Sequence, residues 1–487
     1  MFFSQVATIV VVAVTLVTLF KRWKQNSEGF ESLSTISRIL HPYGVLKRRL
    51  KAWLYLFSGP LIIQTAYNKA NGEPFEILAP DNRYVFVSSQ KHIGELNNAP
   101  DTVLSLQAAS KQMLQPKYTM SGFNWFDRRG TEGVGFIKAL RTLLTNNLPS
   151  ILPSLRIVIA NNFSEMHYAH KVVNAFFGEE LAGNKEFMKS ALSFIEDTLM
   201  TAETVRLLPE WLAQPIGQLL AGMLSSHRTV FDTLLPVAEQ RLLEKQLEKM
   251  GQTVPKHHDC IQWIMETAPK KNPWTGQRIV HELMAIWFGS VHALSTTISF
   301  AIHDLCLHPE YVDPLREEIE GPGYALFEQT AQGLPLLDSF IKESARLTPV
   351  ESMSTRRHAL QPFTLSDGTR VEIGDWACTP VQAMMQDPKE YPEPLQFRGF
   401  RFVDPVLLPG AELPQINRYA RPTHASKLTD VNGSFHVWGT GRMAWAILCS
   451  GRYEDHVSTS NYKLRLRARG QRSFAMVHLA VKYATKK

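Results

Sequence analysis

Four cysteines are the side chains of this 487-residue sequence that could bind a soft metal or act as nucleophiles. They are far apart and form no CxxC pair, which argues against a zinc site or a disulfide framework and predicts a reducing compartment; they are Cys260, Cys306, Cys378 and Cys449. A lone cysteine is usually a small buried apolar residue, so its neighbours must distinguish a functional one. Cys449 has such neighbours, because it follows the glycine-containing segment 435–444, FHVWGTGRMA.

Further chemical motifs precede Cys449 in a definite order. Glu343 and Arg346 are three residues apart and share a helix face, where an exposed pair contributes only about 0.2–0.5 kcal/mol. The arginine-containing segment 394–402, PLQFRGFRF, follows, and then residues 439–444 match the dinucleotide pattern GxGxxA. No strand–helix–strand unit surrounds that match, so we predict no dinucleotide site there. Each motif is weak alone, whereas their combination and order are more specific.

A long apolar stretch comes before these motifs. Residues 283–305 read LMAIWFGSVHALSTTISFAIHDL, with no carboxylate, lysine or arginine before Asp304. By length alone this stretch could be a membrane span. Polar residues interrupt its middle, however, and a helix that is apolar nearly all round can also form the buried core of a large domain. In that case the polar residues at its middle face a cavity or a ligand.

The remaining pattern predicts a mainly α fold with a small β component. Short strands are expected at 75–78 and 84–87, joined by a turn at 80–82, and again near 363–371 around Ser366-Asp367-Gly368. Long stretches between them have helical periodicity. The composition, 44% hydrophobic and 20% charged, is that of a globular protein, and no linker rich in glycine, serine or proline divides the chain. We therefore expect one large domain at 61–487.

The first 60 residues predict attachment to a membrane. Residues 1–20 carry no charge, and Lys21, Arg22 and Lys24 follow at once. This pattern favours a transmembrane helix with its basic end in the cytoplasm. A cleaved signal peptide is the alternative, but its charges would precede the apolar run. Within the basic membrane-proximal segment 21–60, residues 43–57 could form either an amphipathic surface helix or a solvated helix of the domain.

The ordered motifs resemble those of the cytochrome P450 family, in its fungal microsomal form associated with secondary metabolism. The resemblance extends from Gly72-Glu73-Pro74-Phe75 onward and rests on FGSVHALSTT, on KESARL at 342–347 and on FHVWGTGRMA. It implies a cytochrome P450 fold behind an N-terminal transmembrane helix. It also implies a haem cofactor whose iron is bound by a cysteine thiolate, a ligand that donates electron density to the iron.

The resemblance also assigns roles to single residues. Glu343, Arg346 and Arg401 form the charged lock that braces the loop beneath the haem, since arginine can grip a carboxylate in a fixed, bidentate geometry. Cys449 is the axial ligand. Arg356, with Arg357 as a close rival, and Arg442 are expected to meet the haem propionates.

The sequence departs from the family pattern in two places. Where the family has an acid and an alcohol in the central helix, this chain has His292 and Ala293. His292 could relay protons or be a core histidine, and Ser295 or Thr296 could supply the hydroxyl.

The second departure surrounds the cysteine. The family joins GRMA directly to its cysteine, but here Trp445, Ala446, Ile447 and Leu448 intervene. Most of the helix expected after Tyr453 is also missing. An altered splice junction in the gene model and a degenerate protein are the two explanations.

These features imply an enzyme that uses O2, with electrons from NADPH supplied by NADPH–cytochrome P450 reductase, at the endoplasmic reticulum membrane. Its expected substrate is a small apolar secondary metabolite such as a terpenoid. The net charge of +7 does not require nucleic acid, and an acidic protein or an anionic membrane suits it as well. The alternatives are a catalytically impaired haem protein and a peroxide-using or isomerising haem enzyme, which the lack of an alcohol at Ala293 permits.

Overall fold

A computed structural model describes the backbone in ten parts of the chain. These are residues 36–127, 177, 181, 183–257, 259–269, 273–330, 333–408, 426–428, 430 and 434–441. Within them, the side chains of 36–51, 210, 291, 292, 294, 328–330 and 405 are not described. The predicted transmembrane segment 1–20 lies outside these ranges.

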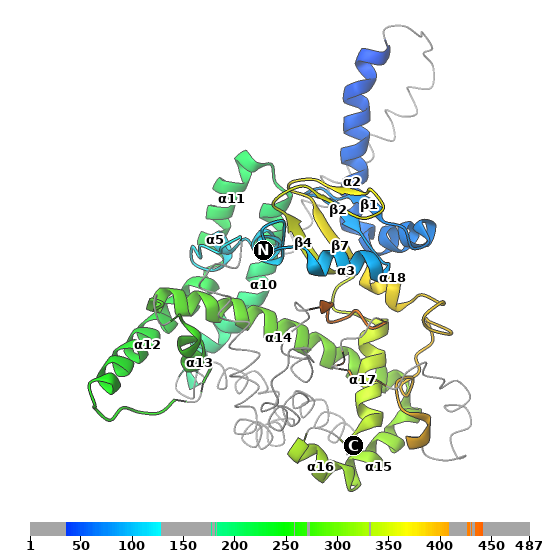
Figure 1. Ribbon diagram of the computed structural model, residues 1–487. Coiled ribbons are helices and arrows are strands. Elements are labelled where there is room, and N and C mark those ends of the chain that lie inside the picture. The colour runs from blue at the N-terminus through cyan, green and yellow to red at the C-terminus, as the bar shows by residue number, and fades with distance from the viewer. Residues whose placement is uncertain are drawn as a thin grey trace. The chain divides into compact units, whose positions relative to one another are not determined.

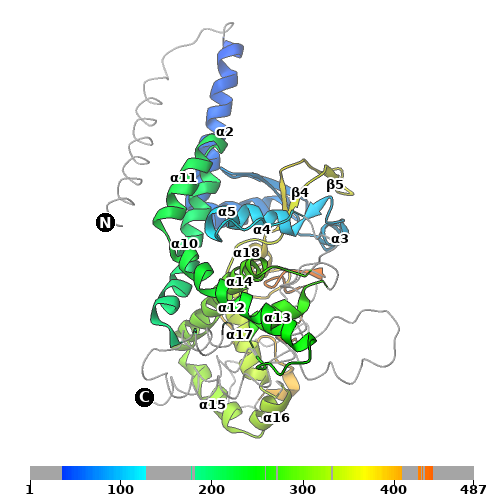
Figure 2. The same cartoon turned by 90° about the vertical axis from the view of Figure 1, so that its left-hand side faces the viewer.

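Helices dominate the described residues, and they gather around one long central helix (Figure 1, Figure 2). The α-helices are α2 (Ile36–Ala70), α3 (Gln90–Asn98), α4 (Leu106–Leu114), α5 (Pro116–Thr119), α10 (Lys185–Leu207), α11 (Glu210–Met223), α12 (Ser226–Lys249), α13 (Cys260–Thr267), α14 (Gly276–Leu307), α15 (Val312–Glu320), α16 (Gly323–Thr330), α17 (Pro335–Leu347) and α18 (Val381–Met385). Short 3₁₀ turns are η2 (Pro309–Tyr311) and η3 (Pro405–Leu407).

A small mixed sheet lies beside the helices. Its strands are β1 (Phe75–Leu78), β2 (Arg83–Phe86), β3 (Leu104–Ser105), β4 (Ser354–Ala359) and β7 (Trp376–Thr379), in the spatial order β1-β2-β7-β4-β3. Only β2 and β7 pair in parallel. A separate hairpin joins β5 (Phe363–Thr364) to β6 (Arg370–Val371), and Gly368 in its turn has a φ of +92°. The predicted mainly helical fold with a small β component is thus confirmed. Strands β1 and β2 and the β5–β6 hairpin lie within one residue of their expected places, whereas β3, β4 and β7 were not predicted.

The central helix α14 is the predicted apolar stretch, and it passes through two hydrophobic cores. Residues Ile279–Phe288, apart from half-buried His281, are buried among α10, α12 and α13. Ala301 and Leu305 belong instead to the core that α15, α17 and the sheet share. The Trp287 indole N–H donates to the carbonyl of Ala191 in α10 over 2.7 Å. Among the described helices α14 alone has the length and hydropathy of a membrane span, but this packing supports the buried-core interpretation.

The chain divides into two compact units, Met1–Phe57 and Ser58–Lys487. The boundary falls inside α2, where Ser58 has non-helical φ and ψ angles of −139° and 23° and kinks the helix. The predicted helix at 43–57 is therefore part of α2.

Candidate functional site

Two of the three cysteines in the described part of the chain are unsuited to chemistry. Cys260 and Cys378 are buried, and burial raises the pKa of both thiols, so both stay protonated and behave as small apolar residues. Cys306 is exposed. Cys449, the expected ligand, lies outside the described residues.

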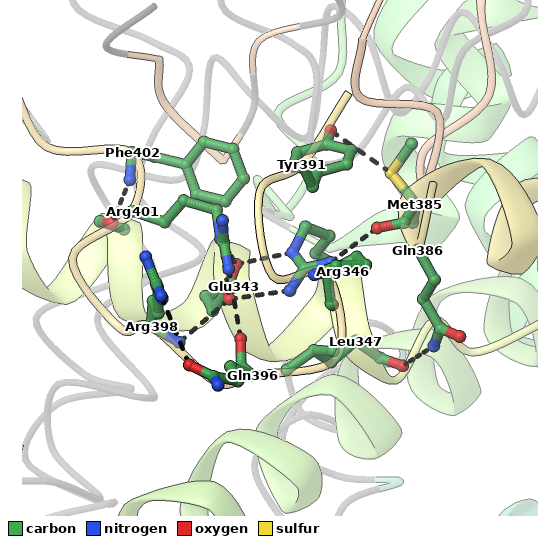
Figure 3. A network of polar contacts seen from close by, with 12 residues as sticks. Glu343, Arg346, Leu347, Met385, Gln386, Tyr391, Gln396, Arg398, Arg401 and Phe402 are labelled. Atoms are coloured by element: carbon green, nitrogen blue, oxygen red, sulfur yellow. Dashed lines mark hydrogen bonds and ion pairs between the residues drawn. The ribbon is translucent and has the colours of Figure 1, made fainter. Parts of the chain in front are cut away.

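Helix α17 carries a charge network that is fully withdrawn from solvent (Figure 3). Glu343 and Arg346 each have a side-chain exposure of 0%. The Arg346 guanidinium donates from Nε and Nη2 to the two carboxylate oxygens of Glu343, over 2.7 and 2.9 Å. On the other side of the same carboxylate, Arg401 Nε lies 3.0 Å from both oxygens. One buried anion is thus shared by two arginines, which is the arrangement that the sequence predicts for Glu343, Arg346 and Arg401.

The network fastens the chain segment between residues 385 and 401 to α17. Arg346 Nη1 donates to the carbonyls of Met385 (2.6 Å) and Pro394 (2.8 Å). The backbone N–H of Arg398 donates to Glu343 over 3.0 Å, as Figure 3 shows. These contacts satisfy donors and acceptors that burial would otherwise leave costly. This segment, the meander at residues 385–401, is therefore held against α17 by charge-assisted hydrogen bonds as well as by packing.

The glycine-containing turn at 439–441 lies between the sheet and α17 (Figure 1). Gly439 and Gly441 have φ angles of +76° and +65°, the left-handed region that favours glycine. A Cβ on Gly441 would come within 2.8 Å of the Asn97 side chain. That side chain donates to Thr440 Oγ1 over 2.9 Å, so α3 fixes the turn from one side.

The two arginines of β4 have different surroundings. Arg357 is buried, and its Nη2 lies 3.5 Å from Asn97 Oδ1, beside the 439–441 turn. Arg356 instead pairs with half-exposed Glu351 at 2.6 Å. The strand has an irregularity at this point, because two residues of β4 between Ser354 and Arg357 oppose a single residue of β7, and Thr355 has a φ of +51°. Arg357, the rival in the sequence-based prediction, is thus the arginine that contacts Asn97, the side chain that holds the turn.

The middle of α14 carries the predicted hydroxyls between the two cores. Ala293 and Thr296 are half-buried, whereas Ser295 is exposed. Thr297, which the sequence analysis did not single out, is buried and donates its hydroxyl to the carbonyl of Ala293 over 2.8 Å. The His292 side chain and all of Arg442 lie outside the described residues.

The fold thus combines a long central helix with a buried charge network and a glycine turn. A family model described as Cytochrome P450 matches residues 111–409, more than half of the chain. The chain belongs to the cytochrome P450 family.

Two similar proteins come from fungi. Cytochrome P450 monooxygenase AN1598 of Emericella nidulans is 26% identical over 418 residues, which cover 80% of this chain and 73% of that protein. Cytochrome P450 monooxygenase hepE of Aspergillus oryzae is 28% identical over 449 residues, covering 84% and 76%. Among solved structures, retinoic acid-bound cyanobacterial CYP120A1 matches with a TM-score of 0.54 and 17% identity, over 85% of each chain. That last likeness concerns the fold alone.

Membership implies an enzyme of the P450 monooxygenase class, with a haem cofactor bound through a cysteine thiolate. The described residues fit such a group. Arg357 is a buried cation beside the glycine turn. Ser290 Oγ on α14 and Arg356 Nε are buried atoms without a hydrogen-bond partner among the residues that the structure describes. Haem, when bound through a thiolate, supplies the oxidising power that inserts oxygen into a C–H bond.

Sequence reasoning missed the residues that fix the glycine turn from a distance. Asn97 carries no motif of its own, and it meets Thr440 of the turn across 343 positions. The motif KESARL assigns no role to its first residue, Lys342, yet the Lys342 side chain is completely buried. The sequence signal for this burial is that Lys342 immediately follows Phe340 and Ile341 in an amphipathic helix.

Proposed function

We propose that this chain is a membrane-bound haem-thiolate monooxygenase with Cys449 as the axial ligand of the haem iron. The observation that carries the proposal is the Glu343 carboxylate shared by two buried arginines. An uncompensated charge in the protein interior is costly, and this network fastens the chain that leads toward the cysteine loop. Residues 61–487 then form the haem-binding domain.

Arg357 and Arg442 are the residues that we assign to the haem propionates. Arg357 is favoured over Arg356 because it lies beside the 439–441 turn, which Arg442 follows directly. Both guanidinium groups could donate paired hydrogen bonds to a carboxylate. Arg356 is already paired with Glu351.

On the oxygen side of the haem we assign proton delivery to α14. His292 would relay protons, and a hydroxyl would hold the intervening water. Thr296 is favoured over Ser295 for that hydroxyl, because Thr296 is half-buried and Ser295 is exposed. The substrate is a small apolar secondary metabolite such as a terpenoid, which suits a helix with no carboxylate, lysine or arginine between Glu282 and Asp304.

The proposed location is the endoplasmic reticulum membrane, with the catalytic domain in the cytoplasm. Residues 1–20 would span the bilayer, and residues 21–60 would lie against its surface. Exposed Trp53, Leu54 and Phe57 in α2 support this, because they follow Lys47, Arg48, Arg49 and Lys51 in one helix. The electrons would come from NADPH–cytochrome P450 reductase, an acidic partner for a chain of net charge +7.

A second candidate is a catalytically impaired haem protein. The four residues at 445–448 add about one helical turn before Cys449, and Trp445 stands where the family has its cysteine. Such an insertion displaces the thiolate unless the loop bulges. Because most of the helix expected after Tyr453 is also missing, the thiolate would be less shielded from water. We therefore expect the Cys449 ligand to protonate easily to a neutral thiol. A peroxide-using or isomerising enzyme is the remaining alternative, and turnover with peroxide alone, without reductase and NADPH, would identify it.

The test is the absorption spectrum of the reduced, carbon-monoxide-bound protein. We would compare the full chain with a version that lacks residues 445–448 and carries a family helix after Tyr453. The shortened version should give the thiolate band, and the full chain a weak or thiol-like band. Cys449→Ser should abolish the thiolate band, whereas the matched control Cys306→Ser, at an exposed cysteine, should not. Absence of haem from both versions would overturn the proposal, and a full thiolate band from the unaltered chain would remove the impaired alternative.

A further inference from the structure

Lys342 is a buried cation that the charge network around Glu343 does not use. Its side chain has no solvent exposure, and Nζ donates to Ser426 Oγ and to the carbonyl of Lys427, both over 2.7 Å. The ammonium also lies 4.7 and 4.5 Å from the ring centres of Phe402 and Phe435. Burial of a lysine is costly unless hydrogen bonds and ring faces replace its water. These contacts therefore tie Lys342 to three separate places in the later chain, at residues 402, 426–427 and 435.

Asp338 lies four residues before Lys342 on the same stripe of α17. Its half-buried carboxylate accepts the backbone N–H of Leu428 over 2.9 Å. The segment 426–428 is thus held at three points by two side chains of one helix. The segment is also linked onward, because the Trp438 indole N–H donates to the carbonyl of Leu428 over 2.8 Å.

Different residues of α17 hold different pieces of chain. Glu343 and Arg346 bind the meander between residues 385 and 401. Asp338 and Lys342 bind 426–428 and, through Phe435 and Trp438, the chain entering the glycine turn. The Phe435 ring is itself packed edge-on against Phe402 at 5.9 Å, directly under the ammonium. A single rigid helix therefore sets the position of both segments.

We propose that Asp338 and Lys342 are positioning residues that hold residues 426–428 and 434–438, and with them the turn from which the chain runs to Cys449. This inference rests on the proposed haem site for its functional meaning. The contacts of Asp338 and Lys342 with residues 426–428 and Phe435 do not themselves depend on bound haem. The two can therefore fail separately.

The experiment measures amide hydrogen exchange of the detergent-solubilised full-length protein. Lys342→Met keeps the length of the side chain and removes its charge and donors, and Lys189→Met, at an exposed position of α10, is the matched control. Hydrogen bonds from charged groups contribute about 1.5–3 kcal/mol. We therefore expect peptides covering 434–441 to exchange at least about tenfold faster in Lys342→Met. Peptides covering 392–401 should be unchanged, and Lys189→Met should behave as wild type.

Equal acceleration in both segments would overturn the proposal, because it would make Lys342 a general stability residue, and so would no acceleration in either. Asp338→Asn is the milder second variant if Lys342→Met does not fold, because the amide oxygen can still accept from Leu428. It should accelerate exchange at residues 426–428 and 434–438 alone. The spectroscopic readout is the thiolate band of the shortened version that lacks residues 445–448, and Lys342→Met in that version should weaken the band relative to total bound haem. Selective exchange in a chain that binds no haem would refute the proposed function and leave the positioning role intact.

Discussion

Replacing Glu343 with alanine tests whether α17 is held by its buried charges. The substitution removes the anion that faces Arg346 at 2.7 Å and Arg401 at 3.0 Å. Both guanidinium groups would then remain in the protein interior without their carboxylate. The backbone N–H of Arg398 would lose its acceptor as well.

The expected loss in the free energy of unfolding follows from the number of charged groups that lose their partner. Removing one partner of a buried ion pair costs about 3–5 kcal/mol, and here one carboxylate serves two cations. We therefore expect a loss of about 5 kcal/mol or more in the free energy of unfolding. A whole domain is stable by only about 5–15 kcal/mol, so Glu343→Ala should accumulate little folded, haem-containing protein. Glu343→Gln should lose less, because its amide oxygen still accepts one hydrogen bond.

The assay combines urea unfolding, followed by tryptophan fluorescence, with the ratio of bound haem to protein. Asp313→Ala is the matched control, since Asp313 and Arg316 form another ion pair three residues apart in a helix, with the Asp313 side chain 81% exposed. Its expected cost is within about 0.5 kcal/mol. If Glu343→Ala resembles this control and keeps a normal haem content, the buried network does not brace the fold.

Three further predictions concern other parts of the chain. Burial raises the pKa of Glu318 to about 7, against the opposing effect of the N–H groups of α17 that it accepts. The folded state therefore keeps a proton that the unfolded chain releases, and stability should fall by up to about 3 kcal/mol as the pH rises from 4.5 to 7. Urea midpoints at pH 5 and 8 should differ less in Glu318→Gln, and an unchanged difference would contradict this assignment. Arg357→Met should lower haem retention on gel filtration more than Arg356→Met, because Arg357 lies beside the glycine turn; the reverse order would restore Arg356 to the propionate role. In sealed microsomes, added protease should digest the bulk of the chain, and deletion of residues 1–20 should release the protein from the membrane, whereas protection of the bulk would show that the orientation is wrong.

Much of the fold could be read from local patterns. The strand pair at 75–78 and 83–86, the hairpin around Gly368 and the long apolar helix α14 all depend on neighbours in sequence. Their periodicity and turn residues are local properties, so they predict the element without knowledge of the rest of the chain. Glu343 and Arg346 belong to the same group, since a spacing of three places them on one face of α17.

The partners of these elements were decided only by tertiary structure. Glu343 meets Arg401 across 58 residues, and Lys342 meets Ser426 across 84. Nothing in the local sequence distinguishes a buried lysine or glutamate from an exposed one, because burial depends on the segments that pack on the helix. The choice between Arg356 and Arg357 depended on the extra residue in β4 beside Thr355. One inserted residue in a strand exchanges the faces of the side chains that follow, and such a shift becomes visible only when β4 is paired with β7.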